Sequence, residues 1–186
     1  MPNRYVLMSR KNEIATEAHV LRATTVFLIE RGASPYQFSI ASGKGIDSKS
    51  IEANLKELFS KVGYNPSFVS NGPDILAISE EEWWIIECKG SGFGTPQTQR
   101  NNFDRALASV VSYYEDSPNE LQNEYKNVKV TLGLALPATR QYLNELRRRV
   151  RKPLRKRLNL WILLFDIGTQ KIIPVQPEHD YMEVNV

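Results

Sequence analysis

The hydrophobic positions of this chain form two kinds of pattern, one with helical spacing and one that is almost continuously apolar. In the first kind, apolar residues recur every three or four positions, which predicts helices over 12–31, 50–62, 97–114 and 139–152. The first of these helices is predicted to start at an Asn12 cap, and Pro153 is predicted to end the last one.

The apolar segments between these helices predict strands over 66–69, 74–78, 83–89, 128–136 and 160–166. Residues 79–82 alone separate the second strand from the third, so these two are expected to form an antiparallel hairpin. Near-continuous apolar runs are typical of strands that are buried on both faces. Helices link the later strands, which favours parallel pairing there. We therefore expect an α/β fold of three layers, α/β/α, with a mixed sheet flanked by helices.

A chain of 186 residues predicts one domain, spanning 1–186. Within it we expect an N-terminal helix and loop extension (1–47), a core (48–166) and a C-terminal tail (167–186). The N-terminal segment lacks the apolar block of a signal peptide, and no run is long enough for a membrane helix, so no membrane partner is expected. The single cysteine, Cys88, excludes an internal disulfide and indicates a cytoplasmic environment.

Candidate catalytic residues lie at the ends of the two hairpin strands. Asp74 opens the first strand, and Glu87 and Lys89 close the second, two positions apart and therefore on one face. The start of one hairpin strand lies beside the end of the other, so Asp74 is expected to come close to Glu87. Because unpaired charge is costly to bury, acids at the end of an apolar run indicate a functional site.

Two carboxylates at such a position predict a magnesium site, because Mg²⁺ prefers oxygen ligands and keeps several waters. With only two histidines and one cysteine in the chain, a zinc cluster is excluded. The expected ligands are Asp74, Glu87 and a strand carbonyl, that of Cys88. Lys89 would then orient or deprotonate a metal-bound water, or offset charge in the transition state. The sequence therefore predicts phosphodiester hydrolysis.

The motif formed by Pro73-Asp74 and Glu87-Cys88-Lys89 resembles that of the PD-(D/E)XK superfamily of restriction endonuclease-like nucleases. The resemblance covers about residues 48–166. It implies a restriction endonuclease-like fold, Asp74 and Glu87 as metal ligands, and Lys89 as the lysine of the site. It also implies Mg²⁺ as the cofactor, with Mn²⁺ as a substitute.

The same resemblance implies two further site residues. Many family members add a glutamate from the preceding helix, and Glu52 is preferred over Glu57 because it borders the apolar face near the helix start. Gln99, followed four residues later by Phe103, loosely resembles the Gln-xxx-Tyr element of RecB-like nucleases. Gln97 competes for this role. We therefore expect Glu52 as a further metal ligand and Gln99 as a further catalytic residue.

Positive charge is concentrated in one segment. The net charge is +3, but residues 138–157 contain nine Arg or Lys and one acid, Glu145, which leaves the rest of the chain at −5. Such a face neutralises phosphates and gives sequence-independent affinity for double-stranded DNA. The predicted DNA-binding residues are Arg147, Arg148, Arg149, Arg151, Lys152, Arg155, Lys156 and Arg157.

No separate module for reading a target sequence is evident in the chain. The whole chain looks most like the small catalytic subunit of a heterodimeric type IIS restriction endonuclease. Such a subunit cuts one strand and relies on a larger partner for recognition. The alternatives are a self-sufficient dimeric restriction enzyme, a structure-specific repair or resolvase-like nuclease, and an inactive DNA-binding module.

Overall fold

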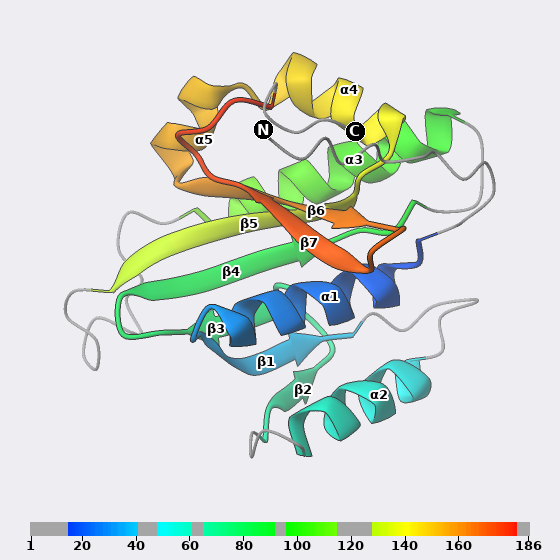
Figure 1. Cartoon of the computed structure of the whole chain (residues 1–186), viewed down its shortest axis with the longest axis vertical. Helices are drawn as coiled ribbons and strands as arrows, with labels where there is room; N and C mark the ends of the chain where they lie inside the picture. The colour runs from blue at the N-terminus through cyan, green and yellow to red at the C-terminus, as the bar shows by residue number, and fades with distance from the viewer. Residues whose placement is uncertain (1–14, 41–47, 61–64, 92–95, 115–127, 182–186) are drawn as a thin grey trace, which may run out of the picture.

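The computed structural model of the chain describes residues 15–40, 48–60, 65–91, 96–114 and 128–181 (Figure 1). Its helices are α1 (Glu17–Glu30), α2 (Ser48–Ser60), α3 (Pro96–Ser112), α4 (Arg140–Arg149) and α5 (Lys152–Leu158). Its strands are β1 (Ser34–Ser39), β2 (Ser67–Val69), β3 (Ile75–Ile78), β4 (Glu82–Cys88), β5 (Lys129–Pro137), β6 (Leu160–Asp166) and β7 (Lys171–Val175).

The strands form one mixed sheet in the order β2-β1-β3-β4-β5-β6-β7. β3 and β4 pair in antiparallel fashion, so the predicted hairpin is confirmed. β4, β5 and β6 are parallel to one another, as expected for strands joined by helices. At the two edges, β2 runs parallel to β1, and β7 runs antiparallel to β6.

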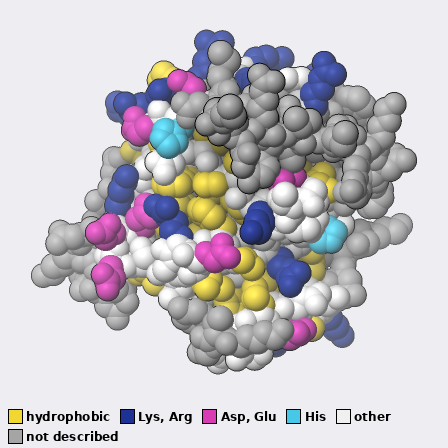
Figure 2. All heavy atoms as spheres, viewed as in Figure 1, with side chains coloured by type: hydrophobic (Ala, Val, Ile, Leu, Met, Phe, Trp, Pro, Cys, Tyr) yellow, Lys and Arg dark blue, Asp and Glu magenta, His cyan; other side chains and the backbone are white. Residues whose placement is uncertain are grey.

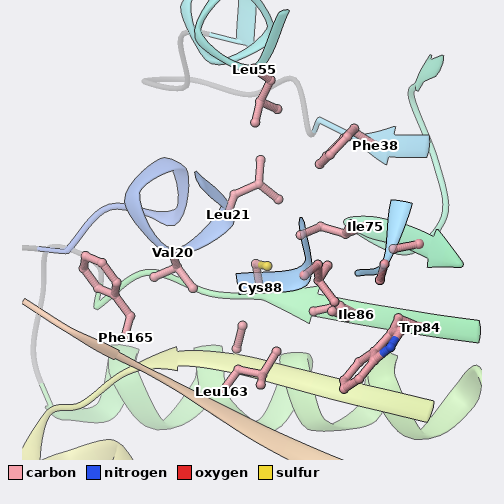
Figure 3. Packing of buried hydrophobic residues seen from close by; sticks show 14 of the residues in the cluster. Val20, Leu21, Phe38, Leu55, Ile75, Trp84, Ile86, Cys88, Leu163 and Phe165 are labelled. Carbon is pink, nitrogen blue, oxygen red and sulfur yellow. The ribbon is translucent and has the colours of Figure 1, made fainter. Parts of the chain in front are cut away.

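Helices cover both faces of the sheet, which confirms an α/β fold with a mixed sheet (Figure 1). α1 lies on one face, and its Val20 and Leu21 pack against side chains of the central strands, including Ile86 and Phe165 (Figure 3). α3, α4 and α5 lie on the other face, where a second core forms. Burial of these two apolar faces is the main force that holds the three layers together.

Two strands were not predicted, β1 and β7. The sequence of β1, SPYQFS, alternates apolar and polar residues only from Tyr36 to Ser39 and contains a proline, so its strand signal is short, and it is held by its pairing with β2 and β3. β7 contains Pro174, which cannot donate to a ladder and is tolerated because β7 is an edge strand. The segments predicted as an extension (1–47) and a tail (167–186) therefore contribute α1, β1 and β7 to the same layered unit.

The basic helix predicted over 139–152 ends earlier than expected and is followed by a second helix. α4 stops at Arg149, Val150 leaves the helical conformation, and α5 begins at Lys152. A proline lacks the amide hydrogen and clashes with the carbonyl four residues earlier, so Pro153 cannot continue α4, but it fits the first turn of a new helix.

The start of α1 is fixed by a capping box. The Thr16 side chain accepts a hydrogen bond from the His19 amide, and the His19 side chain accepts one from the Thr16 amide. The predicted cap, Asn12, lies outside the described residues. Among the helices that the structure describes, none combines the length and the apolar character that crossing a membrane requires.

Candidate active site

Asp74 and Glu87 lie beside each other at one end of β3 and β4. The register pairs Ile75 with Ile86, which places Asp74, one residue before β3, next to Glu87 near the end of β4. The Cys88 amide donates a hydrogen bond of 2.6 Å to Oδ2 of Asp74. This bond fixes the Asp74 carboxyl against the neighbouring strand.

Lys89 follows β4 directly and brings a positive charge to these acids. Its Nζ lies 3.9 Å from a Glu87 carboxylate oxygen and 2.9 Å from one of Glu17. Nζ also lies 3.5 Å from the carbonyl oxygen of Cys88, to which it donates a weak hydrogen bond. The structure therefore brings together Asp74, Glu87, Lys89 and the Cys88 carbonyl, and adds Glu17 to them.

Burial and repulsion from neighbouring acids raise the pKa values of the two strand carboxyls. Burial, followed by the charge of Glu87, raises the pKa of Asp74 from 3.8 to about 8. Burial also raises the pKa of Glu87, although the charge of Lys89 opposes this. For Lys89, burial acts to lower the pKa, but the charge and hydrogen bond of Glu17, with Asp74 and Glu87, outweigh it and raise the pKa.

Glu17 was missed by the sequence-based prediction. It is the first residue of α1, where an acid interacts favourably with the helix dipole, and its side chain reaches Lys89. The sequence-based prediction placed the helix glutamate on α2, because α2 is the helix nearest to the hairpin in the sequence. In the sheet, however, β3 pairs with β1, and the helix that precedes β1 is α1. The segment with α2 and β2 is inserted between β1 and β3 in the sequence, and β2 lies at the edge of the sheet.

A close contact between chain segments holds Glu17 next to Lys89. The Ser91 amide donates to the Ala15 carbonyl at 2.8 Å, and the Ala15 amide donates to Ser91 Oγ at 3.1 Å. Between them, Gly90 packs so tightly that a Cβ there would lie 2.6 Å from the Glu17 nitrogen. Residues 90–91 therefore lock the start of α1 to the end of β4.

Two side chains from the opposite face complete the surroundings of the site. The Tyr142 hydroxyl, from α4, donates a 2.8 Å hydrogen bond to the carbonyl of Gly90. The Tyr113 hydroxyl, just after α3, lies 3.5 Å from Glu87 Oε2. Burial and the charge of Glu87 raise the pKa of Tyr113 to about 12, so its hydroxyl stays protonated and donates to the carboxylate.

The structure does not bring Glu52 or Gln99 to this cluster. Glu52 forms an ion pair with Lys56 on its own helix, α2, and none of its contacts with the described residues joins it to the site. The alternative, Glu57, lies on the same helix. Gln99 is half-buried in the first turns of α3, and no contact within the described part of the chain links it to Asp74, Glu87 or Lys89.

Some residues of the predicted DNA-binding segment form contacts within the fold, and others are exposed without an ion pair to a described residue. The prediction that Arg155 binds DNA is wrong. Arg155 is fully buried: its guanidinium donates to the carbonyls of Gln176 (2.7 Å) and His179 and lies over the Tyr181 ring. It therefore anchors the segment after β7 and cannot contact DNA. The sequence alone could not reveal this role of Arg155, because its partners are backbone carbonyls that are remote in the sequence.

Four other residues of the segment form ion pairs within the fold. Arg148 and Arg149 pair with Glu145, and Arg149 also pairs with Asp104 of α3. The other two pairs, with acids after β7, are Lys152–Asp180 at 3.2 Å and Lys156–Glu178 at 3.0 Å. Arg147, Arg151 and Arg157 are exposed, and no ion pair joins them to other described residues.

The donor set suits a magnesium ion. Two carboxyls, those of Asp74 and Glu87, lie on neighbouring strands, and burial together with the charge of Glu87 raises the pKa of Asp74. Over the residues described, no three His, Cys, Asp or Glu side chains are grouped to enclose a metal on their own. Mg²⁺ does not require such a group, since one or two carboxylates with waters and substrate phosphate are its usual ligands.

Comparisons of this chain with models of protein families, with curated proteins and with solved structures gave no match.

Proposed function

We propose that this chain is a magnesium-dependent nuclease that hydrolyses phosphodiester bonds of DNA. In this proposal Asp74 and Glu87 bind the metal, with Mn²⁺ as a substitute, and Lys89 acts on the reacting atoms. The observation that carries it is the meeting of a buried carboxyl, Glu87, and a half-buried one, Asp74, whose pKa is about 8, beside a lysine ammonium at one sheet end. This combination matches metal-assisted phosphodiester hydrolysis better than a structural ion pair, because Lys89 is engaged mainly by Glu17.

The three site residues, Asp74, Glu87 and Lys89, have distinct roles in the proposed reaction. Bound magnesium supplies polarisation of a phosphate oxygen and lowers the pKa of a bound water. Asp74 is oriented by the Cys88 amide on Oδ2, and Glu87 by the Tyr113 hydroxyl. Lys89 keeps its proton at neutral pH because its pKa is raised, so it acts as a hydrogen-bond donor that stabilises developing negative charge rather than as a base.

The proposal includes double-stranded DNA as substrate and a larger recognition subunit as partner. The second part rests on the resemblance of the sequence to small subunits of type IIS restriction endonucleases. It predicts that the chain alone cuts specific DNA poorly and introduces one strand break beside a defined sequence when its partner is added. Specific double-strand cutting by the pure chain would instead favour the self-sufficient dimer, and preference for branched DNA would favour the repair or resolvase-like alternative.

A cleavage assay tests the chemistry. Plasmid DNA is incubated with the chain, alone or with its recognition partner, in Mg²⁺, in Mn²⁺ and in EDTA. Asp74→Asn, Glu87→Gln and Lys89→Met are expected to lower the rate by roughly 100-fold or more. Glu52→Gln is the control, since it neutralises an acid that is paired with Lys56 and that no contact with the described residues joins to the site. Wild-type rates in all three site variants would refute the proposal, and DNA binding without cleavage in any condition would favour the inactive binding module.

A further inference from the structure

Three arginines of the α4 region lack the ion pairs that neutralise their neighbours. Arg140, Arg147 and Arg151 are exposed, and none of them forms an ion pair with another described residue. Arg140 and Arg147 lie two turns apart on the face of α4 that is opposite its buried residues, about 10 Å from each other at 1.5 Å per residue. We call these three residues the α4 arginine stripe.

The stripe begins at the end of the sheet that carries the candidate active site. α4 starts three residues after β5, whose Ala135 pairs with Cys88 and accepts a hydrogen bond of 2.9 Å from the Lys89 amide. Tyr142 ties the first turn of α4 to Gly90. A polyanion bound at Asp74 and Glu87 can therefore continue onto α4 without crossing an acidic segment of the sheet.

Other Lys and Arg side chains lie around the stripe, together with the acids that pair with them. Figure 2 shows Lys and Arg side chains gathered along the upper rim of the molecule, where Figure 1 places α4 and α5. Several of these are already neutralised: Arg148 pairs with Glu145, Lys152 with Asp180, and Lys156 with Glu178. Within α4 and the two residues that follow it, the arginines without an ion pair to a described residue are those of the stripe.

We propose that the α4 arginine stripe binds phosphates of duplex DNA next to the site of cleavage, whereas the paired residues of the segment serve the fold. The nature of the ligand rests on the proposed function. Guanidinium groups bind phosphate oxygens with two parallel hydrogen bonds, and those of the stripe need not break an internal ion pair to do so. A spacing of about 10 Å spans about three base pairs at 3.4 Å each, so the stripe covers several phosphates.

The test measures DNA affinity without cleavage. The full chain is titrated in EDTA against a fluorescent 20-base-pair duplex, and anisotropy gives the dissociation constant at several concentrations of KCl between 50 and 200 mM. One variant carries Arg140→Gln, Arg147→Gln and Arg151→Gln. The matched control carries Arg148→Gln, Lys152→Gln and Lys156→Gln, which removes the same number of charges from the same segment. Thermal unfolding verifies that both variants are folded.

The stripe variant is expected to bind at least 10-fold more weakly at 50 mM KCl, and the slope of log affinity against log salt to fall by about 3, close to 0.9 per lost phosphate contact. The control is expected to change the slope by less than 1. Equal losses in both variants, no loss in the stripe variant, or no DNA binding by the wild-type chain would overturn the proposal. If the stripe variant does not fold, Arg147→Gln against Arg148→Gln makes the same comparison. Because the assay contains no metal, binding that depends on the stripe can be found even if the chain proves not to cleave DNA.

Discussion

Replacing Asp74 by asparagine should stabilise the metal-free protein at neutral and alkaline pH while abolishing its proposed activity. Asparagine keeps the shape of the side chain and a carbonyl oxygen that can accept the hydrogen bond from the Cys88 amide, now 2.6 Å from Oδ2. It removes the charge that burial and Glu87 oppose. The substitution therefore separates the electrostatic penalty of the site from its packing.

The size of the effect follows from the pKa of Asp74. The folded carboxyl has a pKa of about 8, against the usual 3.8, so the folded state binds this proton more tightly than the unfolded state does. The resulting stability is fully present below pH 3.8 and is lost as the pH rises through about 8. At about 1.4 kcal/mol per pKa unit the total loss is roughly 6 kcal/mol as an upper limit, and about three quarters of it has occurred by pH 7.

Urea unfolding at pH 5, 7 and 9 in EDTA measures this directly. The free energy of unfolding of the wild-type chain should fall between pH 5 and pH 9 by several kcal/mol more than that of Asp74→Asn. Glu52→Gln, which changes an acid paired with Lys56, should follow the wild-type profile. Identical pH profiles for wild type and Asp74→Asn would refute the claim that Asp74 is a carboxyl with a raised pKa.

Three further substitutions test the surroundings of the site and of the basic segment. Glu17→Gln removes the 2.9 Å partner of Lys89 and should lower the cleavage rate about 10-fold with little change in melting temperature; an unchanged rate would exclude Glu17 from the site. Gly90→Ala should destabilise the chain by about 1–3 kcal/mol, because its Cβ would meet backbone atoms of 15–17 at under 3 Å; calorimetry showing no loss would contradict that close packing. Arg155→Ala should cost about 2–4 kcal/mol and speed proteolysis after β7, whereas the exposed Arg157→Ala should have no effect; equal behaviour would contradict the anchoring role.

Much of the fold could be predicted because long apolar runs and helical spacing report burial directly. The hairpin of β3 and β4 and the parallel strands β5 and β6 have this kind of sequence. β1 and β7 do not, because their conformation depends on pairing with strands remote in sequence rather than on their own residues. Because β1 was not predicted, α2 was interpreted as the helix that precedes the sheet, and the helix glutamate was placed on α2 rather than on α1.

The central residues of the site could be proposed from local sequence because strand alternation and hairpin geometry are local rules. Asp74, Glu87 and Lys89 lie within a single hairpin, so their meeting did not depend on tertiary structure. Glu17 lies about 70 residues from Lys89, and only the packing of residues 90–91 on the start of α1 joins them. The basic segment was harder to interpret from the sequence, because a run of like charge does not tell which of its residues are neutralised by acids that are remote in the sequence.

Binding of Mn²⁺ tests the central claim most directly, because it requires neither a recognition partner nor a cognate DNA sequence. Electron paramagnetic resonance can titrate free Mn²⁺ against the wild-type chain, Asp74→Asn, Glu87→Gln and Glu52→Gln at pH 8. We predict that wild type and Glu52→Gln bind the ion, that Mg²⁺ competes for it, and that Asp74→Asn and Glu87→Gln each weaken binding at least 10-fold. Equal affinity in all four proteins, or no binding to the wild-type chain, would contradict a metal site between Asp74 and Glu87.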